Sequence, residues 1–140
     1  MADTPPEERT QHPHPRRLAL RIVTMPRDTN PYGTVFGGVI LSHIDQAGFV
    51  EARHFGCHRW VTASMERVDF HAPVQLGDVV NYFAQTVREG RSSVSIRIEV
   101  DAQRHQTDDI VRVTEATLTM VALGASGKAI DFRSPPTITP

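Results

Sequence analysis

The chain has 140 residues, of which 39% are hydrophobic and 22% charged, and its formal net charge is -1 at pH 7. This length allows one domain with a hydrophobic core and excludes two full domains. The near-neutral charge gives no general attraction to nucleic acid or to an anionic membrane, and no apolar run approaches the roughly 20 residues that span a bilayer. The single cysteine, Cys57, excludes an internal disulfide and predicts a cytoplasmic location.

The N-terminal half predicts a polar leader, one strand and one long helix. Residues 1–16 are rich in proline and charge, which is typical of a disordered leader. A single domain is expected over 17–133, beginning with a strand at 18–25. A turn-rich stretch, "RDTNPYGTVFGG", follows this strand. A helical pattern then runs from about Gly38 to Phe55 and ends before Gly56, a typical helix stop.

From residue 60 onward the pattern changes to strands. Segments 60–70, 79–89, 93–100 and 110–123 are separated by turn-like stretches, and apolar residues alternate with polar ones in the third segment. Residues 134–140 predict a flexible tail. This order favours an α+β fold in which one helix lies across the concave face of a single antiparallel sheet. The edges of such a sheet stay unpaired, so self-association is expected.

The helix contains a carboxylate, Asp45, among its apolar residues. On a helical wheel that starts at Leu41, Asp45 lies about 40° away, on the apolar arc. A buried carboxylate without a partner is costly, so such a group finds a partner, loses its charge or performs chemistry. The wheel therefore leaves two interpretations open, a structural aspartate and a functional acid.

Gly37 and Gly38 stand where the helix begins. Unpaired backbone N–H groups and the positive end of the helix dipole face outward there, and glycine lets an oxygen atom approach closely. Asp45 lies about two turns further, roughly 10 Å along the helix axis. A ligand lying over the helix could therefore contact the amides at one point and the acid at another. A flexible turn is the alternative interpretation of the glycine pair.

Three stretches in this order resemble the hot-dog-fold acyl-CoA thioesterases, in particular the bacterial YciA-like branch and the cytosolic acyl-CoA hydrolases. They are "NPYGTVFGGVILSHIDQAG" (30–48), "VTASMERVDFHAPVQLGDVV" (61–80) and "GRSSVSIRIEV" (90–100), and the resemblance covers about residues 18–123. It implies a hot-dog fold, with one long central helix wrapped by a five- to six-stranded antiparallel sheet. It also implies a dimer with active-site clefts at its interface, and a hexamer made as a trimer of dimers. Where the family commonly has a bulky residue after the glycines, this chain has Val39.

The resemblance also assigns roles to individual residues. Asp45 matches the catalytic acid, Asn30 matches an asparagine that orients the water or the carbonyl, and the amides of Gly37 and Gly38 match the oxyanion hole. A loop that lies near coenzyme A in relatives is matched by Gly90, Arg91, Ser92 and Ser93. The implied reaction is hydrolysis of acyl-CoA to a carboxylic acid and coenzyme A. It uses no metal and no cofactor other than the coenzyme A of the substrate.

Hydrolysis of a thioester can be catalysed by a site with as few polar groups as these. The leaving thiolate resembles that of cysteine, with a pKa of about 8.5, so it departs without a strong general acid. Hydrolysis then needs an activated water or a carboxylate nucleophile, together with donors for the oxyanion. The sequence leaves open whether Asp45 acts as general base or as nucleophile.

Other functions were weighed against this interpretation. His54, Cys57 and His58 form a cluster, but they lack the paired spacings of a zinc site. No Gly-x-Ser-x-Gly motif indicates a serine hydrolase. A dehydratase of the same fold would have a histidine near the helix start, where this chain has Phe36. A non-catalytic sensor or scaffold that binds acyl-CoA in the same cleft is the remaining alternative.

Overall fold

The computed structural model describes residues 14–138. The elements are one strand, one long helix and four further strands: β1 (Arg17–Val23), α2 (Gly37–Ala52), β2 (Arg59–Glu66), β3 (Val79–Glu89), β4 (Ser93–Gln103) and β5 (Ile110–Leu123), with the short 3-10 turns η1 (Pro26–Asp28) and η2 (Arg53–Phe55). The predicted order of elements is confirmed. The α-helix ends three residues earlier than expected, because the 3-10 turn η2 replaces its last turn before Gly56.

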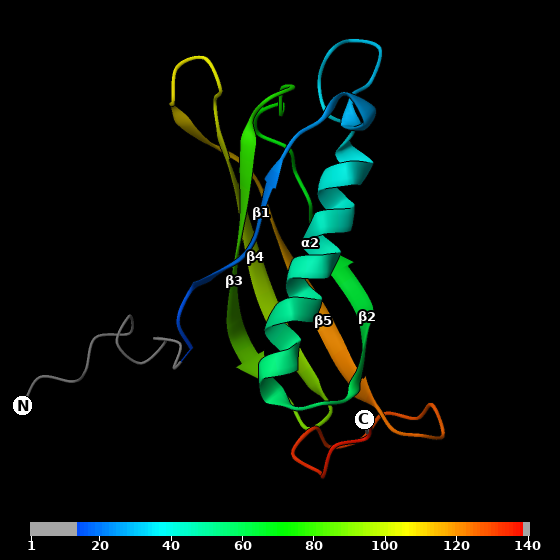
Figure 1. Cartoon of the computed structure of the whole chain (residues 1–140). Helices are drawn as coiled ribbons and strands as arrows, with labels where there is room; N and C mark the ends of the chain where they lie inside the picture. Colours follow the sequence, from blue (N-terminus) through cyan, green and yellow to red (C-terminus); the bar gives the residue numbers. More distant parts are fainter. Residues whose placement is uncertain (1–13, 139–140) are drawn as a thin grey trace, which may run out of the picture.

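The five strands form one antiparallel sheet in the order β1-β3-β4-β5-β2. Figure 1 shows α2 lying across one face of this sheet. The predicted α+β hot-dog architecture, one helix wrapped by a five-stranded sheet, is thus confirmed. Strands β1 and β2 are the two edges. β2 stops at Glu66, before the predicted end at residue 70, because Arg67 takes a left-handed backbone conformation with φ of 45° and interrupts the strand.

The core lies between α2 and the inner face of β3, β4 and β5. In β4 the alternating apolar side chains are fully buried, as the sequence pattern predicts. On the helix, Gly48 permits close packing, since a Cβ atom there would lie 3.1 Å from a methyl carbon of Leu118. This packing of α2 against the sheet determines which side chains of the helix face outward.

Both ends of the described chain contact the domain. His14 Nε2 lies 2.7 Å from Glu89 Oε2, within the segment that the sequence assigns to the leader. At the other end, the backbone N–H of Thr137 donates to the Cys57 carbonyl at 3.1 Å. Residues on either side of the expected domain, 17–133, thus contact it, and these bounds stay a prediction. The rest of the predicted leader and tail, 1–13 and 139–140, lies outside the described residues. Within 14–138, no helix is both long and apolar enough to cross a membrane.

Candidate active site

Asp45 lies in the middle of α2 and is exposed, which corrects the expected position on the buried arc. The buried face of the helix is centred near Ile44, which is fully buried, whereas Leu41 is only partly buried. Successive helical residues are about 100° apart, so Asp45 is turned away from the sheet while Ile44 faces it. The wheel was centred on the wrong apolar residue, because apolar side chains also occupy the flanks of this helix.

The buried acid of α2 is Glu51, which the sequence analysis missed. Its side chain is 1% exposed and accepts hydrogen bonds from Arg17 Nε at 3.2 Å, Arg17 Nη2 at 3.1 Å and Thr86 Oγ1 at 2.9 Å. Glu51 follows Ile44 by seven residues, so the two share one face of the helix, and this spacing was the available signal. With its oxygens bonded on both sides, Glu51 joins the end of α2 to β1 and β3.

Asp45 faces an open hollow and not the core. Its Oδ1 accepts a hydrogen bond from Thr62 Oγ1 of strand β2, and the Thr62 hydroxyl also lies 3.2 Å from Met120 Sδ. The hollow has a volume of about 390 Å³ and is otherwise walled mainly by apolar side chains, including Phe49 and Trp60. Among residues 14–138, no cation forms a salt bridge with Asp45, and no donor bonds its Oδ2. One carboxylate oxygen is therefore held by Thr62, and the other is available to a ligand.

Gly37 and Gly38 form the exposed first turn of α2. Neither has a left-handed φ, and a Cβ atom at Gly38 would meet no heavy atom within 4 Å. At Gly37 a Cβ atom would only touch the ring of Phe70, at an ordinary contact distance of 3.6 Å. Their N–H groups bond no carbonyl among the described residues. Since the fold does not require glycine at either position, the open space and the free donors there favour contact with something outside the chain.

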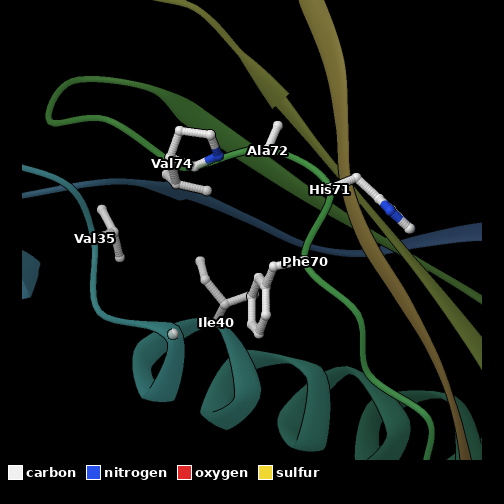
Figure 2. Close-up of a pocket in the computed structure, with 8 residues that line it drawn as sticks. Val35, Ile40, Phe70, His71, Ala72 and Val74 are labelled. Carbon is white, nitrogen blue, oxygen red and sulfur yellow. The ribbon is translucent and has the colours of Figure 1, made fainter.

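A pocket lies beside this first turn. It has a volume of about 320 Å³, and Figure 2 shows side chains from the helix and from the loop after β2 around it. Gly37 forms part of its wall, together with Ile40, Phe70 and Val74. The first turn of α2, with its free N–H groups, and an apolar cavity are thus adjacent.

The two halves of the predicted site are separated within one chain. The hollow at Asp45 and the pocket at Gly37 share no lining residue. Eight residues of helix place the two positions about 12 Å apart along the axis. Hydrogen-bond distances are about 3 Å, so one carbonyl group cannot contact both. Within one chain the acid and the amides are therefore too far apart to act on the same carbonyl group, and the expected cleft at a dimer interface stays a prediction.

Asn30 shapes the loop that leads into the helix. Its Oδ1 accepts hydrogen bonds from the backbone N–H groups of Tyr32, at 2.9 Å, and Thr34, at 3.1 Å, and its Nδ2 donates to Thr34 Oγ1 at 2.7 Å. These contacts form an Asx turn, a common use of asparagine in loops. The predicted role of Asn30 toward a water or a carbonyl stays a prediction, for which one amide hydrogen remains.

The predicted coenzyme A loop, Gly90 to Ser93, is the hairpin turn between β3 and β4. The Gly90 N–H donates to the Ser93 carbonyl at 2.7 Å, and the Arg91 side chain is exposed. Figure 1 shows this turn at the end of the sheet opposite the start of α2. Strand pairing places Val94 beside Met120 and Met120 beside Thr62. The turn is therefore about two strand spacings, roughly 10 Å, from the residue that holds Asp45.

The histidines lie apart from Asp45. His58 is buried, and its Nε2 lies 2.7 Å from the Phe132 carbonyl oxygen, so it packs the C-terminal segment. His43 contacts the Tyr82 hydroxyl at 3.3 Å on a different face of α2. Burial lowers the pKa of His43, and the charge of Asp28 opposes this only in part. Within residues 14–138, no three His, Cys, Asp or Glu side chains are grouped as metal ligands.

Known proteins share the sequence and the fold of this chain. A family model described as the thioesterase superfamily matches residues 32–108. Acyl-CoA thioester hydrolase YciA of Escherichia coli is 40% identical over 114 residues, which are 79% of this chain and 86% of that protein. A hexameric hotdog fold thioesterase of Campylobacter jejuni superposes with a TM-score of 0.77 at 42% identity, covering 82% of this chain and 89% of the other. HI0827, a hexameric broad specificity acyl-coenzyme A thioesterase solved as an aspartate-to-alanine mutant, gives 0.78 at 35% identity, covering 82% and 85%.

Proposed function

The chain belongs to the thioesterase superfamily, and we propose that it hydrolyses acyl-CoA thioesters to free carboxylic acids and coenzyme A with Asp45 as the catalytic carboxylate. The single observation that carries this proposal is the Asp45 side chain, which lines a hollow and has one carboxylate oxygen held by Thr62. Two of the relatives named above, YciA and HI0827, are acyl-CoA thioester hydrolases and support the same reaction class.

The reaction proceeds by attack on the thioester carbonyl carbon. As general base, Asp45 takes a proton from a water molecule, whose oxygen bonds to that carbon and forms a tetrahedral oxyanion. Donors such as the N–H groups of Gly37 and Gly38 stabilise this oxyanion, and such a donor is worth about 3 kcal/mol of barrier. The carbon–sulfur bond then breaks, and the thiolate leaves as coenzyme A. As nucleophile, Asp45 would instead form a mixed anhydride, which water hydrolyses to the same products.

Thr62 positions the carboxylate for either route. Its hydroxyl has one proton, which it donates to Asp45 Oδ1. The bond restrains rotation of the carboxylate, so that the group keeps one orientation at the hollow. Thr62 is thus a positioning residue on a rigid strand, and coenzyme A enters only as part of the substrate.

A second copy of the chain completes the site in this proposal. Strand β2 is an edge of the sheet, and two apolar side chains that line the hollow with Asp45 are exposed, Phe49 by 42% and Val61 by 37%. An edge strand with such neighbours favours pairing with another copy. Pairing along β2 would bring the helix start of one copy toward Asp45 of the other. Three such dimers would form a hexamer, the assembly of the similar thioesterases.

The turn at Gly90 to Ser93 is proposed to contact the coenzyme A portion. The Arg91 guanidinium is exposed and forms no salt bridge with residues 14–138, so it is available for a charge-assisted bond to a phosphate. Coenzyme A thioesters and the free thiol of Cys57 are both compatible with a reducing, cytoplasmic location.

The test of the proposed function is thiol release from a panel of acyl-CoA substrates. We expect Asp45→Asn to lower kcat about 10²- to 10⁴-fold, the usual contribution of a general base, without changing the thermal unfolding midpoint. Asp109→Asn, an exposed aspartate in the loop before β5, is the matched control and should keep full activity. Equal release by the Asp45 variant would remove this residue from the mechanism. Binding of acyl-CoA with no release by the wild type would support the non-catalytic sensor instead.

A further inference from the structure

The turn between β3 and β4 is held by the C-terminal segment, residues 130–138. The backbone N–H of Phe132 donates to the Arg91 carbonyl at 3.1 Å, and the Arg133 guanidinium donates to the Gly90 carbonyl at 3.1 Å. Figure 1 shows the C-terminal segment, in red, beside this turn. The tips of hairpins are generally mobile. These two bonds from outside the hairpin therefore give the backbone of Arg91 a defined position.

Phe132 joins the C-terminal segment to the core. Its side chain is 3% exposed, and its ring packs against the rings of Phe55 and Trp60, with centroids 5.5 Å and 5.9 Å away. On its other side, the Arg133 guanidinium lies 4.2 Å from the centroid of the Phe132 ring. A ring packed so closely fixes the backbone that bears it. The N–H of Phe132 thus keeps its direction toward the turn.

His58 holds Phe132 from within the core. The His58 side chain is buried, its Nε2 lies 2.7 Å from the Phe132 carbonyl oxygen, and its Nδ1 lies 3.1 Å from Thr137 Oγ1. A carbonyl oxygen only accepts, so Nε2 carries the proton and donates it to Phe132. The backbone N–H of Thr137 also donates to the Cys57 carbonyl, next to His58. His58 therefore fastens the C-terminal segment at two points.

Packing alone does not require a histidine at this position. A buried imidazole loses its hydration, and only well-placed hydrogen bonds offset that cost. A leucine would fill the space with apolar atoms but would take the donor away from the Phe132 carbonyl. The ring of His58 therefore selects one position of the C-terminal segment, and its bonds lead through Phe132 to Arg91.

We infer that His58 is a positioning residue for the coenzyme A contact, an inference that rests on the proposed function. The Arg91 guanidinium is proposed to meet a phosphate, and the contacts that start at His58 fix the backbone that carries this side chain. A ligand that meets a turn already in place does not have to order it, and so binds more tightly. His58 is buried, so it acts through Phe132 and not on the substrate.

The test compares an acyl-CoA with the matching acyl-pantetheine, which has the same thioester but lacks the nucleotide and its phosphates. His58→Leu should raise KM for the acyl-CoA about threefold to tenfold, the cost of ordering one flexible side chain on binding. We expect kcat for the acyl-CoA, and both kcat and KM for the acyl-pantetheine, to stay at the wild-type values. The hydrogen bonds that this variant loses do not include Asp45.

Three further variants sharpen the test. His58→Gln has a side-chain amide that can donate to the Phe132 carbonyl in place of Nε2, and should restore the wild-type KM. His105→Leu removes an exposed histidine from the loop between β4 and β5, and is the matched control. Should His58→Leu fail to fold, Thr137→Val decides the question, because it removes the other bond to the ring and nearly keeps the shape of the side chain. A rise in KM confined to the acyl-CoA is then expected, and an unchanged KM would overturn the inference.

The outcomes separate this inference from the function beneath it. An equal change for both substrates, transmitted for example through Trp60, would leave His58 a structural role only and overturn the inference. A wild type with the same KM for both thioesters would overturn the coenzyme A contact, and this inference with it, while the hydrolase stands. Absence of thiol release from both substrates would overturn the proposed function itself.

Discussion

The fold alone does not explain why residue 38 is a glycine. Its backbone conformation is open to any amino acid, and the space around it is empty to 4 Å. We therefore predict that Gly38→Ala leaves the free energy of unfolding unchanged or raises it by up to about 1 kcal/mol, the helix-propensity difference between the two residues. The same methyl group should lower kcat/KM at least about tenfold, because it stands where the carbonyl oxygen approaches its donors.

Chemical denaturation and thiol release measure the two effects separately. Gly127→Ala is the control with the opposite expectation, since Gly127 has a φ of +82° in a turn remote from the helix start. That variant should lose about 1 kcal/mol of stability and keep its activity. Full activity in Gly38→Ala would show that nothing approaches the first turn of α2.

Single residues differ in how well the sequence predicts their roles. The family resemblance points to Asp45 as the catalytic acid, which stays a prediction, and the helical wheel points to the same residue for a physical reason that is wrong. Asp45 was expected to be notable because it is buried, and it is instead exposed beside a hollow. Glu51, the acid that is buried, has no motif and was overlooked. Helical periodicity gives relative angles only, and the absolute orientation depends on which face meets the sheet.

At the scale of elements, the end of α2 depends on one buried cluster. Glu51 is 1% exposed and is bonded by Arg17 from β1 and by Thr86 from β3. We predict that Glu51→Ala lowers the free energy of unfolding by about 2–4 kcal/mol, because it leaves Arg17 and Thr86 without their acceptor. The expected loss is smaller than for a fully buried ion pair, because Arg17 is 37% exposed and regains some hydration when Glu51 is removed.

Urea unfolding followed by circular dichroism measures this loss. Glu115→Ala is the matched control, since Glu115 also forms salt bridges with arginines but is 42% exposed on the outer face of the sheet. Exposed pairs contribute about 1 kcal/mol or less, so this control should change stability little. Similar losses in the free energy of unfolding for the two variants would show that the burial of Glu51 adds nothing to the stability that its hydrogen bonds provide.

Elements were predicted better than the places where they end. The alternation in β4 identifies both the strand and its buried face, because a period of two has only one structural meaning in a sheet. The end of β2 was misplaced because its cause, the left-handed backbone of Arg67, has no signal in an arginine. The 3-10 turn η2 was missed for a similar reason, since its residues also fit a helical pattern. Local conformation at boundaries is decided by tertiary contacts that a sequence does not display.

At the scale of the whole molecule, the proposed site falls into two halves on one chain, and β2, one of the two edge strands, lies beside the first half. The acid of one half and the amides of the other are about 12 Å apart along the helix. The edge strand β2 runs beside the acid through Thr62, so any copy that pairs with this strand lies next to Asp45. The spacing along the sequence predicts this separation, but it does not reveal which copy of the chain supplies which group to one site.

Subunit mixing distinguishes a shared site from one contained in a single chain. If one copy supplies Asp45 and the other supplies the helix start, a heterodimer of Asp45→Asn and Gly38→Ala chains has one site with both wild-type halves and one with neither. Random pairing of equal amounts should therefore restore about one quarter of wild-type activity, since half of the dimers are mixed and each has one intact site. Differently tagged chains, coexpressed or refolded together, allow the mixed species to be purified and its thiol release measured. A mixture no more active than the mean of its two variants would place the whole site within one chain, and the separation along α2 would then exclude Gly38 from the oxyanion hole.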